Sequence, residues 1–98
     1  MTTCPHANIR DFDPDRLNSA DGLAAAVQIV LDDARRGCFG RNDGMTYLNV
    51  TNVIENALGV RVKAKRIVAA IEATPHVEKF VRFTMPAYRL TGQLTLAV

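Results

Sequence analysis

Residues 49–93 carry the pattern that most constrains how this 98-residue chain can fold. Apolar residues at helical spacing predict one helix over residues 49–59 and a second over residues 63–73, with three residues between them. Two stretches rich in β-forming residues follow, 77–83 and 88–93, and the Pro-containing segment 85–87 reads as the turn between them. We therefore expect two helices joined by a tight corner and followed by an antiparallel hairpin.

A longer helix is predicted earlier in the chain, over residues 20–36. Ser19 or Asp21 can cap its first turn, and Gly37 supplies its end. Asp32 and Asp33 fall on the side that we expect to face solvent. The residues that recur at helical spacing and should form a buried face are Leu23, Val27, Val30, Leu31 and Ala34.

Residues 1–18 show no apolar periodicity, and Pro5 and Pro14 interrupt any helix there. We expect an irregular acidic arm, which Ile9 and Phe12 attach to the rest of the protein.

Residues 19–98 are expected to form a single α+β domain of three helices and a small antiparallel sheet at the C-terminal end. Residues 45–48 include β-formers and should pair with the later hairpin as a short third strand. Asn49 or Asn52 is then expected to cap the next helix, with Glu55 completing a capping box after Asn52.

Charge is distributed unevenly between the two halves of the chain, although the net charge is only +2. Residues 1–44 contain five Arg and seven Asp, whereas residues 45–98 contain seven Lys or Arg and three Glu. The first half therefore has a net charge of −2 and the second half of +4. A basic segment that coincides with the two helices and the hairpin favours a nucleic-acid partner.

Several classes of function are not expected. Cys4 and Cys38 lie 34 residues apart, and together with His6 and His76 they match no compact zinc module, so we expect free thiols, no metal and no cofactor. The chain has no glycine-rich phosphate loop and no nucleophile–base pair, which predicts no catalytic residues, no enzymatic activity and no small-molecule substrate.

Residues 22–31 form too short an uncharged run to span a membrane, and the first residues lack the features of a signal peptide, so a cytoplasmic location is expected.

Residues 20–93 resemble the winged helix-turn-helix superfamily of bacterial and phage regulators. TYLNVTNVIENALGV (residues 46–60) looks like the strand, helix and Leu-Gly-Val corner that precede a recognition helix. YRLTG (residues 88–92) looks like the closing strand of the wing. The resemblance implies a DNA-binding module in which helix 63–73 meets the duplex and the hairpin flanks it.

One position departs from the superfamily's usual pattern. The sixth residue after the corner Gly59 is usually apolar, but here it is Lys65, and the apolar pair Ile67 and Val68 follows two to three residues later. We therefore expect a longer corner or a rotated second helix.

Two functions remain open from the sequence. The first is a small DNA-binding regulatory protein that contacts duplex DNA through Arg61, Lys63, Lys65, Arg66, Lys79, Arg82 and Arg89. The second is a protein-interaction module without enzymatic activity: a phage-type inhibitor, an adaptor or a dimerisation domain. The alanine-rich outer side of helix 63–73 and the apolar final segment favour it, and a homodimer or a protein partner would then use Leu94, Leu96 and Val98.

Overall fold

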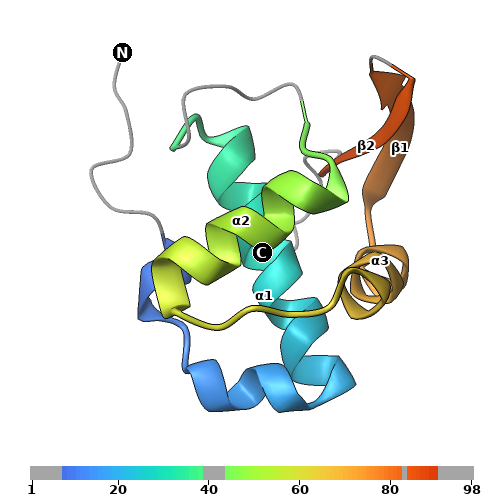
Figure 1. The fold of residues 1–98 in the computed structure, drawn as a ribbon. Coiled ribbons are helices and arrows are strands. Elements are labelled where there is room, and N and C mark those ends of the chain that lie inside the picture. Colours follow the sequence, from blue (N-terminus) through green and yellow to red (C-terminus); the bar gives the residue numbers. More distant parts are fainter. Residues whose placement is uncertain (1–7, 39–43, 83, 91–98) are drawn as a thin grey trace.

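The computed structural model describes residues 8–38, 44–82 and 84–90. Figure 1 shows three helices grouped together, with a two-stranded hairpin rising beside α3. This arrangement confirms the predicted α+β class with a C-terminal hairpin. The elements in chain order are the 3-10 helices η1 (Asn8–Asp11) and η2 (Pro14–Asn18), the helices α1 (Ala20–Arg35), α2 (Tyr47–Leu58) and α3 (Ala64–Ala73), and the strands β1 (Val77–Arg82) and β2 (Met85–Leu90).

Helix α1 lies at the centre of the core and contacts α2, α3, β2 and both 3-10 helices. Its predicted apolar face is buried as expected, and Ser19 caps the helix by accepting a hydrogen bond from the backbone N–H of Gly22 at 3.0 Å. The other elements bury Val50 and Ile54 from α2, Ile67 and Ile71 from α3, and Tyr88 and Leu90 from β2.

Residues 8–18 form two 3-10 helices, whereas the sequence led us to expect irregular structure. Pro14 suits the first turn of η2, where its missing N–H is not needed, and the Asp13 side chain accepts a hydrogen bond from the N–H of Asp15. Ile9 and Phe12 are both buried, so the predicted attachment of this segment to the rest of the protein is confirmed.

Asp33 corrects one expectation for α1. It was assigned to the solvent side, but its side chain is fully buried. One carboxylate oxygen accepts a hydrogen bond from the N–H of Ile9, and the other forms an ion pair with Arg36. Helical spacing could not predict the burial of Asp33, because η1 covers a part of α1 that lies outside the predicted apolar face.

The first turn of α1 passes unusually close to η2. A Cβ atom added to Gly22 would lie 1.8 Å from the carbonyl oxygen of Arg16, well inside contact distance. Glycine at this position therefore permits the two helices to approach each other.

Helix α2 begins earlier than predicted, at Tyr47, and its cap is Thr46 rather than Asn49 or Asn52. The Thr46 hydroxyl accepts a hydrogen bond from the N–H of Asn49 at 3.2 Å, and the Asn49 side chain accepts one from the N–H of Thr46 at 3.0 Å. This reciprocal pair draws Tyr47 into the helix. The expected third strand is reduced to one bridge, in which Met45 pairs with Tyr88.

The hairpin turn also differs from the prediction. Residues 85–87 belong to β2, and Met85 pairs with Arg82 while Pro86 pairs with Val81. The N–H of Tyr88 donates to the Met45 carbonyl, on the side of β2 away from β1. Backbone groups alternate along a strand, so the nitrogen of Pro86 lies on that same outer side, where its missing N–H breaks no β1–β2 hydrogen bond.

Cys38 is disulfide-bonded, so the expectation of a free thiol at this position is wrong. The chain's other cysteine, Cys4, lies outside the described residues. The backbone N–H groups of Ile9 and Cys38 both donate to Asp33, which brings the start of η1 close to this turn. Cysteine spacing along the sequence carries no information about such proximity.

Candidate nucleic-acid interface

Helix α3 turns its apolar side inward and its lysines outward. Ile67 and Ile71 are buried, whereas Lys63 and Lys65 are exposed. The corner before α3 runs from Gly59, whose φ of 74° ends α2, to Lys63. Helix α3 therefore begins at Ala64, one residue later than predicted.

The N-terminal end of α3 lacks the side-chain cap that α1 and α2 both have. Lys63 is the N-cap residue and makes no side-chain hydrogen bond to the helix, and the first turn contains no acidic residue. Free backbone N–H groups and the helix dipole make this end electropositive, and Lys63 and Lys65 add two full charges. The arrangement is unfavourable for the isolated helix but well suited to an anion such as a phosphate.

The hairpin contributes a third exposed lysine, Lys79 on β1. Within the described residues, Lys63, Lys65 and Lys79 form no ion pair. Their charges are therefore available to a partner.

Three arginines of the predicted set, Arg61, Arg66 and Arg89, have partners within the protein. Arg61 forms an ion pair with Glu55 at 2.7 Å, and Arg89 forms one with Glu78 at 2.9 Å. The Arg89 guanidinium also lies over the Phe80 ring, 4.5 Å from its centre.

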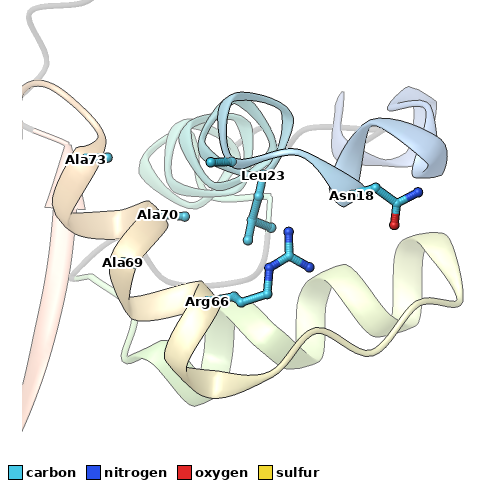
Figure 2. Close-up of a pocket in the computed structure, with 7 residues that line it drawn as sticks. Asn18, Leu23, Arg66, Ala69, Ala70 and Ala73 are labelled. Carbon is cyan, nitrogen blue, oxygen red and sulfur yellow. The ribbon is translucent and has the colours of Figure 1, made fainter.

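Arg66 points toward η2. It is half-buried, and its Nη2 donates a hydrogen bond to the Leu17 carbonyl oxygen at 2.7 Å, which ties α3 to η2 (Figure 2). Arg82 is the last residue of β1.

Sequence reasoning missed the carboxylates that engage these arginines. Glu55 and Arg61 lie six residues apart across a corner, and Glu78 and Arg89 meet only because the hairpin register pairs them. Neither separation produces a periodic signal in the sequence.

The predicted self-association residues, Leu94, Leu96 and Val98, lie outside the described residues. Among residues that the structure describes, the exposed large apolar side chains are Leu48 and Val81, and Val81 is 73% exposed. No group of three or more His, Cys, Asp or Glu residues in the described ranges could hold a metal ion.

Comparisons with family models, curated proteins and solved structures found no match for this chain. Among the described helices, none combines the length and the apolar character that crossing a bilayer requires.

Proposed function

We propose that this protein binds duplex DNA and acts as a small regulatory protein of the winged helix-turn-helix type. The N-terminal end of α3, with Lys63 and Lys65, would contact phosphates, and Lys79 would hold the flanking backbone from the hairpin. The uncapped start of α3 between two outward-facing lysines carries the proposal. A helix end of this kind binds phosphate through its N–H groups and its charge together.

Phosphate contacts should contribute more to binding than base contacts. Reading base edges requires side chains such as Arg, Asn or Gln on the surface that enters the groove. The exposed side of α3 instead presents Ala64 together with Lys65 and Glu72. We therefore expect affinity for many sequences, modest discrimination between them and a steep dependence on salt.

Fluorescence polarisation with labelled duplexes of several unrelated sequences, titrated over a range of salt concentrations, tests the proposal. If the three lysines each contact one phosphate, the logarithm of the association constant should fall with the logarithm of salt concentration with a slope of about −2.7. Lys65→Gln should weaken binding to every sequence and make the slope less negative by about 0.9.

Arg10→Gln is the matched control, because Arg10 is an exposed cation of η1, outside the α3 and hairpin surface. It should leave both the affinity and the slope unchanged. Absence of binding at low salt, or equal effects of the two variants, would contradict the proposal.

A second candidate function is a protein-interaction module, and the exposed Val81 on β1 favours it. Within the described residues β1 pairs only with β2, so its outer edge is open to another strand. Light scattering would detect a homodimer, and Val81→Lys should reduce its mass to that of a monomer. An unchanged mass would remove β1 as the interface.

A further inference from the structure

A hollow of about 350 Å³ lies where η2 and the start of α1 face α3, and we call it the α1–α3 hollow (Figure 2). Its polar side chains are Asn18 and Arg66, and Ala20 also lines it. The rest of its wall is apolar and consists of Leu23, Ala69, Ala70 and Ala73.

The hollow exists because α3 presents alanine where larger residues would fill the space. Ala69, Ala70 and Ala73 recur at helical spacing on the side of α3 that faces the hollow. Ligand-binding sites typically combine a mostly apolar wall of this kind with a few converging polar groups, and they start at roughly 300 Å³. The α1–α3 hollow therefore has room for a small molecule.

Arg66 gives the hollow its charge. Its Nη2 is held by the Leu17 carbonyl oxygen at 2.7 Å, which fixes the guanidinium within the hollow (Figure 2). A guanidinium carries five N–H groups, so donors remain for a ligand. The lining residues include no Asp or Glu that could neutralise this charge.

An apolar wall with one fixed guanidinium selects a particular chemistry. Carboxylate matches the fork of N–H groups on arginine, and a short apolar body matches the alanine and leucine wall. We infer that the α1–α3 hollow binds a small amphipathic carboxylate, such as a monocyclic aromatic acid. This inference does not depend on DNA binding, because the residues that line the hollow include none of Lys63, Lys65 and Lys79.

The test uses the full chain and two probes of equal shape, phenylacetate and phenylacetamide. Titration of each into isotope-labelled protein is followed by amide chemical shifts in NMR spectra. Phenylacetate should give saturable shifts at Leu23, Ala69, Ala70 and Ala73. Phenylacetamide should bind about tenfold more weakly, because hydrogen bonds to a charged acceptor are stronger than those to a neutral one.

Two variants distinguish the contribution of the hollow's charge to ligand binding from the contribution of its volume. Arg66→Gln should remove the preference for the acid over the amide. Ala69→Phe, at an exposed position, should fill the hollow, abolish binding of both probes and leave the spectrum of a folded protein. Arg10→Gln should bind as the unsubstituted protein does.

Three results would each overturn the inference: no saturable shift at the four wall residues, equal binding of the acid and the amide, or unchanged phenylacetate binding in Ala69→Phe. All three results stand even if Arg66→Gln fails to fold, because none of them requires that variant.

Discussion

The backbone N–H of Ile9 donates a hydrogen bond to Oδ2 of Asp33 at 3.0 Å, and this bond joins η1 to the last turn of α1 across 24 residues of sequence. The Asp33 side chain is fully buried, and its second oxygen pairs with Arg36, whose side chain is 38% exposed. A buried carboxylate is tolerated here because both of its oxygens have partners.

Asp33→Ala should lower the free energy of unfolding by about 2–4 kcal/mol, because it leaves the buried N–H of Ile9 without an acceptor and breaks the ion pair. Asp33→Asn keeps an acceptor for Ile9 and should cost less, about 1–2 kcal/mol. Urea denaturation of the disulfide-bonded protein measures both. A loss below about 0.5 kcal/mol for the alanine variant, within the range of ordinary surface substitutions, would mean that the bond does not anchor η1.

The sign of the stability change in Gly22→Ala shows whether helix propensity or tertiary packing dominates at this position. Alanine normally stabilises the interior of a helix by roughly 1 kcal/mol relative to glycine. Here the added Cβ would collide with the Arg16 carbonyl oxygen, so we expect a loss of stability of about 1–3 kcal/mol in thermal or urea unfolding. A stabilised variant would show that η2 can move away from α1 at little cost.

Lys63→Asp should change stability and DNA binding in opposite directions. Aspartate is a favoured N-cap residue and suits the positive end of the helix, so the variant should gain about 1 kcal/mol in unfolding free energy. The same carboxylate would occupy the proposed phosphate site, so DNA affinity should fall by about tenfold or more. Lys63→Ser, a cap without charge, should stabilise the protein and weaken DNA binding less. DNA affinity that survives in Lys63→Asp would exclude this end of α3 from the interface.

Glu55→Gln should strengthen DNA binding. The pair between Glu55 and Arg61 is largely exposed, with 39% and 71% of the two side chains accessible, so breaking it should change stability by less than about 1 kcal/mol. Arg61 then becomes free to contact a phosphate, and the salt dependence should steepen by about 0.9 in slope. Asp21→Asn removes the same charge from the exposed start of α1 and serves as the control. An unchanged slope in Glu55→Gln would mean that Arg61 does not reach the DNA backbone.

The order of elements was predictable because it depends on local patterns. Apolar spacing and the Ser19 cap identified α1, Gly59 marked the end of α2, and the inward direction of Ile67 and Ile71 on α3 followed from helical periodicity. The start of α2 was harder to predict, because Asn49 and Asn52 were both plausible caps. The helix is instead capped by Thr46, which exchanges hydrogen bonds with Asn49.

The sequence predicted which cations could belong to the candidate interface, but not how they are arranged in the structure. All seven cations of the second half of the chain were candidates, yet Arg61 and Arg89 are paired with glutamates and Arg66 binds a carbonyl oxygen of η2. The residues in each of these contacts are brought together by a corner, by the strand register or by helix packing. The spacing of residues along the sequence therefore does not predict them.

The sequence by itself determined the three helices, the hairpin and the basic character of the second half, because each follows from the properties of residues a few positions apart. Only the tertiary structure decided that Asp33 would be buried under η1, that Arg66 would face the α1–α3 hollow and that Lys63, Lys65 and Lys79 would keep their charges available. These outcomes depend on which surfaces meet when distant segments pack, and the packing of the whole chain sets those distances.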